Sequence, residues 1–289
     1  MSSENMNIQW YPGHMTKTRR QIEADLKNVD AVCEIVDARI PMSSRNPDID
    51  SICANKPRII LLNRMDLADP ETTKRWLTYF RSNGMAAVAT DCKSQKGIGA
   101  FQPAVRSVLK EKIERNAAKG MNKPLKVMIV GIPNVGKSTL INQISGRKGA
   151  KAENRPGVTR GKQWVTVDSS LLLLDTPGIL WPKFDDPNVG MMLAFTGAVK
   201  ENVIDTEELA ARLMELLWKH YPNVLKDRYK VDIQEELPGY MLLEEAGRKR
   251  GYLLSRGEIN TERMAKVLLD EYRSGKLGHF TLEVPEDLH

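Results

Sequence analysis

A phosphate-binding motif is the sequence feature that most limits what this chain can fold into. Residues 131–138 read GIPNVGKS and match the pattern G-x-x-x-x-G-K-S. This motif works as a turn between a buried strand and a helix whose N-terminus faces the phosphates. The apolar run 125–130 predicts the strand, and 137–144 predicts the helix. The sequence therefore predicts a phosphate site in an α/β fold, with a glycine-rich turn that binds nothing as the alternative.

The same loop indicates where the phosphates and a metal ion are expected. Lys137 can reach β- and γ-phosphate oxygens, and Ser138 can bind Mg²⁺. Asn134 can help to hold a monovalent cation such as K⁺ near these phosphates, or it can be a turn residue with no ligand. The residues of this segment expected to contact the nucleotide are Asn134, Val135, Gly136, Lys137, Ser138 and Thr139.

A second motif follows the apolar run 171–174. The sequence DTPG begins at Asp175, which places this carboxylate at the end of a predicted strand. There Asp175 can hold the magnesium shell, and the N–H of Gly178 can sense a γ-phosphate. Thr159 lies between the two motifs, in the Gly-, Lys- and Arg-rich stretch 146–160, and can close on the phosphate and the metal. A lone threonine in such a loop otherwise has no function.

Residues 63–66 read NRMD after the apolar run 58–62, and they predict the base specificity. Guanine presents two adjacent donors that one carboxylate can accept, whereas adenine has an acceptor at the equivalent ring position. Taken alone, this motif is more often a turn or a cap, but beside the other two motifs it favours guanine, with Asp66 as the reader and Asn63 steadying the loop. The expected base contacts are Asn63, Arg64, Met65 and Asp66, with Asp91 and Cys92 in a second loop.

The order of these motifs is unusual. In an ordinary GTPase the phosphate loop comes before the base-reading motif, whereas here it follows. We therefore expect a circularly permuted GTPase domain whose DTPG motif leads directly into the rest of the chain. Small GTPases place a Gln after that glycine to orient the attacking water, but this chain has Ile179 and Leu180. Slow intrinsic hydrolysis is expected, with the missing group supplied by an ion, another segment or a partner.

Together these motifs resemble the circularly permuted GTPase family of ribosome assembly factors. The resemblance covers nearly the whole chain and includes WYPGHM at 10–15, DARIP at 37–41 and GKLG at 275–278. It implies GTP hydrolysis stimulated by the large ribosomal subunit, a late role in the maturation of that subunit, and dependence on Mg²⁺ and often K⁺. It also implies that a hydrophobic residue replaces the catalytic Gln, as Ile179 does. In the family the residue corresponding to His14 is a candidate for positioning the water, while packing or contact with RNA is the alternative.

Two positions depart from the family pattern. Arg64 stands where the base-reading motif usually has Lys, and although its planar guanidinium can stack over a base, the change is not conservative. Nucleotide affinity can therefore differ from the family norm. Asp91 and Cys92 replace the usual small Ser-Ala pair, which leaves the contacting residue of that loop open.

The remaining pattern predicts two domains. Helices are predicted at 71–83 and 101–119, and short apolar runs predict strands buried on both faces. These runs are 31–36, 58–62, 86–89, 125–130, 163–167 and 171–174. The expected fold class is α/β, a circularly permuted GTPase domain with a mostly parallel sheet, followed by a small all-α domain. The expected boundaries are 1–18 for an N-terminal extension, 19–182 for the GTPase domain and 183–289 for a helical RNA- or ribosome-binding domain.

Sequence signals also predict two helices of the second domain. Asp205 or Thr206 can cap one helix, and Asn260 or Thr261 can cap another that ends near Gly275. Leu209, Leu213, Leu216 and Leu217 fall on one face of the first helix, and Met264, Val267 and Leu268 follow in the second.

Charge and composition limit the partners. The formal charge of +6 and the pI near 9.1 moderately favour a polyanion. Two basic groups flank the predicted GTPase domain and are candidate rRNA contacts through phosphate, although short cationic runs are often only solvated faces. They are Lys17, Arg19, Arg20, Arg248, Lys249 and Arg250.

The other compositional signals favour a soluble cytoplasmic protein, and we expect no membrane or DNA partner and a monomer, although the sequence does not determine the oligomeric state. No apolar run approaches the roughly 20 residues that span a bilayer, and residues 1–7 are polar. Three cysteines without paired or zinc-ligand spacing predict neither disulfides nor a metal site, and Cys33 is expected to pack as a small apolar residue. The preferred function is a nucleotide-gated assembly factor for the large ribosomal subunit. The alternatives are a signalling or transport GTPase with a protein effector, and a binding module whose nucleotide is never turned over.

Overall fold

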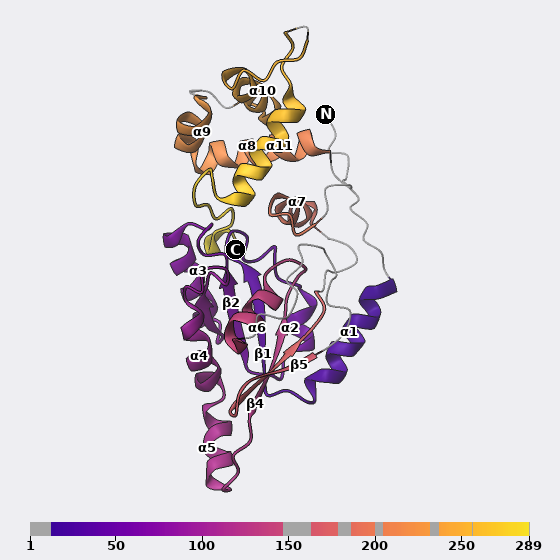
Figure 1. The fold of residues 1–289 in the computed structure, drawn as a ribbon, viewed down its shortest axis with the longest axis vertical. Coiled ribbons are helices and arrows are strands. Elements are labelled where there is room, and N and C mark those ends of the chain that lie inside the picture. The colour runs from indigo at the N-terminus through magenta and orange to yellow at the C-terminus, as the bar shows by residue number, and fades with distance from the viewer. Residues whose placement is uncertain are drawn as a thin grey trace. The chain divides into compact units, whose positions relative to one another are not determined.

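The computed structural model describes residues 13–146, 163–178, 186–199, 205–231, 237–255 and 257–288. These residues form two compact units (Figure 1). We call residues 13–178 together with 283–288 the sheet unit, and residues 186–282 the helical unit. The chain thus passes from the sheet unit into the helical unit and returns to the sheet unit at Glu283.

The sheet unit is built on six strands in the order β3-β2-β1-β4-β6-β5. All neighbours pair in parallel except β5, which is antiparallel to β6. The strands are β1 (Ala31–Asp37), β2 (Arg58–Asn63), β3 (Ala86–Ala89), β4 (Leu125–Val130), β5 (Gln163–Asp168) and β6 (Leu171–Asp175). Each strand coincides with one of the predicted apolar runs, and the mixed α/β class with a mostly parallel sheet is confirmed.

The burial of the strands follows their place in the sheet. Every residue of the inner strand β1 is buried, as expected for a parallel strand with both faces covered. The prediction of burial on both faces is wrong for β5, in which Val165 is buried but Gln163 and Trp164 are exposed. The reason is that β5 lies at the edge of the sheet, where antiparallel pairing lets one face remain open to water.

The sheet unit also contains helices. They are α1 (Gly13–Leu26), α2 (Asp48–Ile52), α3 (Pro70–Ser82), α4 (Phe101–Val108), α5 (Lys110–Ala118) and α6 (Lys137–Ser145). The sequence predicts α3, whose first turn holds Pro70 and is capped by the Asp69 carboxylate, which accepts the N–H of Thr72 at 2.6 Å. It does not predict α1 or α2, because α2 has only five residues and α1 is weakly amphipathic.

One predicted helix is divided in the structure. The single helix predicted over 101–119 is wrong, because the backbone leaves helical geometry at Leu109 (φ −108°, ψ 14°). Phe101 and Val105 of α4 are buried, and so is Leu109, whereas α5 has no buried residue. The chain therefore bends at the last buried residue of this segment, and α5 continues as a mostly polar helix.

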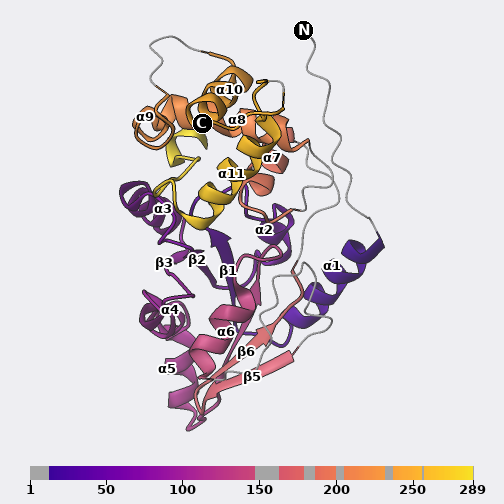
Figure 2. The ribbon, with the colours of Figure 1, turned by 45° about the horizontal axis from the view of Figure 1, so that its top comes forward.

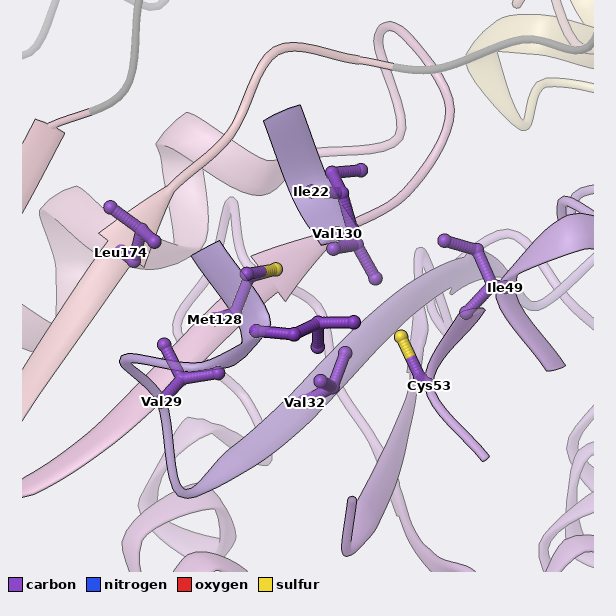
Figure 3. Close-up of a cluster of buried hydrophobic side chains, with 9 residues drawn as sticks. Ile22, Val29, Val32, Ile49, Cys53, Met128, Val130 and Leu174 are labelled. Carbon is purple, nitrogen blue, oxygen red and sulfur yellow. The ribbon is translucent and has the colours of Figure 1, made fainter. Parts of the chain in front are cut away.

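An apolar cluster covers one face of the sheet (Figure 3). Side chains of α1, α2, β1, β4 and β6 meet in it, and its members are Ile22, Leu26, Val29, Val32, Ile49, Cys53, Met128, Val130 and Leu174. Cys33, one residue after Val32, points to the opposite face and is also fully buried. Cys33, Cys53 and Cys92 are free thiols, and the expected apolar packing of Cys33 is confirmed.

The helical unit holds five helices in its described residues. They are α7 (Pro187–Phe195), α8 (Thr206–His220), α9 (Pro222–Tyr229), α10 (Gly239–Lys249) and α11 (Thr261–Ser274). Figure 2 shows α8, α10 and α11 packed side by side. Asp205 accepts two N–H groups at the start of α8, and Asn260 accepts one at the start of α11, so both predicted caps are confirmed. No helix in the described part of the chain is long and apolar enough to cross a membrane.

Candidate nucleotide-binding site

Three motif loops meet at one edge of the sheet. Residues 63–66 follow β2, residues 131–136 follow β4, and residues 175–178 begin at the end of β6. These strands run parallel, so their carboxyl ends lie together, and the register pairs Asp37 with Asn63 and Ile129 with Asp175. Ligands of open α/β sheets bind outside this edge.

The phosphate loop is shaped by close approaches that exclude side chains. A Cβ on Gly136 would lie 2.2 Å from Nδ2 of Asn63, and the residue has φ +112°. A Cβ on Gly131 would lie 2.6 Å from the carbonyl oxygen of Ile35, with φ +152°. Both positions therefore require glycine. α6 begins directly after Gly136, so the first N–H groups of the helix adjoin the loop.

Lys137 is buried against this loop. Its Nζ donates to the carbonyl oxygens of Gly131 at 3.0 Å and Ile132 at 2.7 Å. Burial lowers the pKa of Lys137 to about 8, although the negative charge of Asp175 opposes the shift. A phosphate oxygen would stabilise this cation better than carbonyl groups do, because it carries a full charge. Ser138 and Thr139 follow in the first turn of α6 and are partly buried.

Asp175 carries a buried acceptor without a partner. Its Oδ1 has no hydrogen bond among the described residues, and the residue is 7% exposed. Burial raises the pKa of Asp175, and the charge of Lys137 only partly offsets this effect. A buried, unsatisfied carboxylate oxygen beside a phosphate loop fits the shell of a magnesium ion, which prefers oxygen ligands and retains several waters.

The segment after Asp175 lies against β4 and the phosphate loop. Oγ1 of Thr176 donates to the carbonyl oxygen of Ile129 at 2.7 Å. A Cβ on Gly178 would lie 2.8 Å from N and Cα of Pro133 and 3.1 Å from Nζ of Lys137. The predicted γ-phosphate sensor and the predicted phosphate-binding lysine are therefore neighbours.

Asn63 links the base-reading loop to two others. Its Nδ2 donates to the carbonyl oxygen of Val135 at 2.7 Å, and its Oδ1 accepts the N–H of Cys92 at 3.0 Å. The N–H of Met65 donates to the carbonyl oxygen of Thr90 at 3.1 Å. The structure thus brings together the segments that the sequence analysis assigned to the base and to the phosphates.

The remaining predicted base contacts differ in exposure. Asp66 is exposed, while Cys92 is buried and presents its backbone N–H to Asn63. Burial alone would raise the pKa of Asp91, but hydrogen bonds donated by Ser94 and Lys93 hold the pKa below its ordinary value. Asp91 is therefore an ionised carboxylate that is already engaged by its own loop.

Arg64 reaches back from the base-reading loop to the phosphate loop. Its Nη2 donates to the carbonyl oxygen of Asn134 at 2.8 Å, and its Nη1 lies 3.6 Å from Oδ2 of Asp37. Asp37 and its partner Arg39 belong to the segment 37–41, to which the sequence analysis gives no chemical role. The signal that could have revealed them is an acidic residue at the end of a predicted inner strand, followed two residues later by an arginine.

Some predicted site residues lie outside what the structure describes. Thr159 and the side chains of His14, Lys17 and Arg19 are in this group, and Arg20 is exposed. The second basic group lies at the end of α10, where acidic residues accompany it. Arg248 pairs with Glu244 and Glu245, Lys249 with Glu245, and Arg250 lies 3.6 Å from Glu271.

Comparisons with known proteins agree with this geometry. A family model described as 50S ribosome-binding GTPase matches residues 126–231. Ribosome biogenesis GTPase A of Priestia megaterium is 48% identical over 285 residues, which is 98% of each chain. A GDP-bound structure of YlqF has a TM-score of 0.66 at 29% identity and covers 93% of this chain and 100% of that chain. A GNP-bound crystal structure of YlqF from T. maritima has a TM-score of 0.62 at 28% identity, with 93% and 99% covered. The chain therefore belongs to the ribosome biogenesis GTPase A family.

Proposed function

We propose that this protein hydrolyses GTP and acts as a nucleotide-gated factor in late assembly of the large ribosomal subunit. Family membership supports the reaction and the ribosomal context. The observation that carries the proposal within the chain is the joining of three loops at one sheet edge. Asn63 bonds to both the phosphate loop and the loop at Cys92, and Gly178 adjoins Lys137.

GTP would lie along this edge with its phosphates at the N-terminus of α6. Lys137 would exchange its two carbonyl partners for β- and γ-phosphate oxygens, and the N–H of Gly178 would meet the γ-phosphate. Asp66, which is exposed at the end of the base-reading loop, would accept both guanine donors. The loops that hold these groups are already bonded to one another, so little ordering is needed on binding.

Magnesium and potassium are proposed cofactors of the same site. Ser138, Thr159 and Asp175 would hold Mg²⁺, which supplies positive charge to the phosphates. The unpartnered Oδ1 of Asp175 supports this assignment. Asn134 would contribute to a K⁺ site near the phosphates.

Hydrolysis would be slow in the isolated protein. Ile179 stands where small GTPases place the water-orienting Gln, and its side chain cannot bond to water. Docking on the pre-ribosomal particle would complete the catalytic arrangement, with His14 positioning the water. Stimulation by the particle is therefore part of the proposal.

The order of motifs supports a circular permutation of the GTPase domain. Of the predicted all-α domain at 183–289, the helical unit at 186–282 is the part that we propose binds rRNA. Along the chain, the next described helix after Gly178 is α7, which belongs to the helical unit. A change at the γ-phosphate sensor would therefore act along the chain on the helical unit. The proposed rRNA contacts are Lys17, Arg19, Arg20, Arg248, Lys249 and Arg250.

Co-sedimentation with isolated ribosomal subunits tests this function. The protein is incubated with each subunit under GTP, GDP or a non-hydrolysable analogue, at two salt concentrations. We expect binding to large-subunit particles with the analogue, release with GDP, weaker binding at high salt and faster GTP turnover on the particle. Nucleotide-independent binding would contradict the gating. A salt-insensitive protein partner without stimulation would indicate a signalling or transport GTPase.

A further inference from the structure

Asp37, the last residue of β1, holds one arginine firmly. Its Oδ1 accepts the backbone N–H and the Nε of Arg39, both at 3.0 Å, and its Oδ2 accepts Nη2 at 2.8 Å. Both residues are buried, with side chains 4% and 0% exposed. The carboxylate is therefore fixed in position by a partner that belongs to the same short segment.

The same carboxylate faces a second arginine. Oδ2 of Asp37 lies 3.6 Å from Nη1 of Arg64, and Nη2 of Arg64 donates to the carbonyl oxygen of Asn134 at 2.8 Å. One planar guanidinium thus spans from the end of β1 to the phosphate loop. Burial alone would raise the pKa of Asp37, but the positive charges of Arg39 and Arg64 hold the pKa below its ordinary value, so the carboxylate is ionised.

The backbone at both ends of this link is unusual. Arg64 has φ +61° and Asn134 has φ +59°, which is the left-handed region. Asparagine adopts this conformation readily, whereas arginine does so at a real cost. Such a conformation persists only when its surroundings hold it. The contacts of Arg64 with Asp37 and Asn134 contribute to that hold, together with the backbone bond from the N–H of Leu67 to the carbonyl oxygen of Arg64 at 2.9 Å.

We infer that Asp37 is a positioning residue for nucleotide binding, because it fixes the guanidinium of Arg64 in the orientation that joins the base-reading loop to the phosphate loop. The inference rests on the proposed function, since it assigns a role at the same nucleotide site. The Arg64 side chain is 30% exposed, so without the carboxylate it can turn into solvent. Because both loops contact the same nucleotide, a shift of one loop relative to the other lowers the affinity for GDP and GTP alike.

A double-mutant cycle on nucleotide affinity tests the inference. Kd for a fluorescent GDP and a fluorescent GTP analogue is measured for the wild type, Asp37→Asn, Arg64→Met and the double variant. In the wild-type background, Asp37→Asn should raise both Kd values about tenfold, the size expected for one lost charge-assisted contact. In the Arg64→Met background, Asp37→Asn should change Kd less than about twofold, because no guanidinium remains to be positioned.

A matched control separates positioning from general damage. Glu34 is another buried carboxylate of β1, and its Oε2 accepts from Arg45 and Arg58, neither of which belongs to the three motif loops. Glu34→Gln should lower the melting temperature as Asp37→Asn does, because each removes the charge of a buried carboxylate that faces two arginines. Its Kd for GDP should remain that of the wild type.

A second variant, Asp37→Glu, tests the inference if Asp37→Asn does not fold. Asp37→Glu retains the charge beside Arg39 but moves the carboxylate by one methylene, and it should show the same dependence on Arg64. An equal rise of Kd in both backgrounds, or no rise in either, overturns the inference. If instead the wild type binds guanosine and adenosine triphosphates equally, the proposed function fails first, so the two failures are distinguishable.

Discussion

At the scale of residues, some polar groups of the site hold its loops together, whereas others remain available to a ligand. Both ends of the Asn63 amide bond to the protein, with Nδ2 on Val135 and Oδ1 on the N–H of Cys92. A Cβ at Gly136 would collide with that amide. Asp66, by contrast, is exposed. The amide therefore builds the loop, while the carboxylate remains free to contact a base.

Replacing the carboxylate of Asp66 should change base preference. In Asp66→Asn one acceptor becomes a donor, which no longer matches the two donors of guanine but does match xanthine, whose C2 carries a carbonyl oxygen. We expect GTP to bind about 100-fold more weakly, because a donor of the amide would face a donor of guanine, and a buried donor without an acceptor costs about 1–3 kcal/mol. The affinity for xanthosine triphosphate should rise. Competition binding with both nucleotides measures this. Unchanged selectivity would refute Asp66 as the guanine reader.

Thiol reactivity should follow the burial of the cysteines. Burial raises the pKa of Cys53 and of Cys92 to about 11 from an ordinary value near 9. Because the unfolded thiols ionise first as pH rises, the free energy of unfolding should fall between about pH 9 and 11. At pH 8 only about 0.1% of each folded thiol is ionised, so alkylation should be slow and should quicken about tenfold per pH unit.

Mass spectrometry of iodoacetamide-treated protein checks this expectation. Folded protein at pH 8 should stay largely unmodified, whereas urea-unfolded protein should be alkylated at all three cysteines. Rapid labelling of Cys92 in the folded state would mean that the loop beside Asn63 opens readily.

At the scale of elements, the strands could be predicted from the sequence, whereas the division of the helix predicted over 101–119 into α4 and α5 could not. Each strand of the sheet is a continuous apolar run bounded by polar residues, which is a local signal. The break at Leu109 depends on where packing against the unit ends, and the exposure of β5 depends on its place at the sheet edge. Neither property can be predicted from the local sequence pattern. The caps Asp205 and Asn260 could be predicted because capping is itself local.

The candidate site shows the same limit. The phosphate loop, the segment at Asp175 and the base-reading loop could be found because each has fixed spacing along the chain. The link from Asp37 through Arg64 to Asn134 could not, since it joins three segments that only the parallel sheet brings together. The roles assigned to Thr159 and His14 stay predictions.

The C-terminal segment supplies an acceptor for two backbone N–H groups of the turn at 41–44. The Glu283 carboxylate accepts the N–H of Met42 at 2.7 Å and that of Ser43 at 3.1 Å. Glu283→Ala should lower the stability of the sheet unit by about 1–2 kcal/mol, since two N–H groups lose their acceptor. Urea denaturation followed by circular dichroism measures the change.

Glu286 offers the matched control for this experiment. It pairs with Arg75 at the surface, where the two side chains are 59% and 47% exposed. Glu286→Ala should therefore change stability by less than about 0.5 kcal/mol. Equal effects of the two variants would show that the loss of charge, rather than of the bonds to Met42 and Ser43, accounts for the result.

At the scale of the whole molecule, the chain connects nucleotide chemistry to a second body. The sheet unit carries all three motif loops, and the helical unit follows the DTPG motif along the chain. If a ribosomal particle completes the catalytic arrangement, a substitution should be able to slow GTP turnover on the particle without changing nucleotide affinity.

His14→Ala separates these two properties. We expect turnover on large-subunit particles to fall about 100-fold, the usual contribution of a positioned acid–base group, while GDP affinity stays unchanged. His220→Ala is the control, because His220 is exposed at the end of α8. Turnover is measured as phosphate release with and without the particles. Matching losses of affinity and turnover would assign His14 to packing.

The return of the chain to the sheet unit at Glu283 makes residues 186–282 an insertion within another fold. The Trp76 indole, fully buried, donates its N–H to the carbonyl oxygen of Glu283 at 3.0 Å. Cutting the chain before residue 186 would strip that acceptor from an interior donor. Excising 186–282 and joining the flanking residues by a Gly-Ser linker would retain Glu283, so a stand-alone catalytic core is better obtained by deletion from the middle than by shortening from the end.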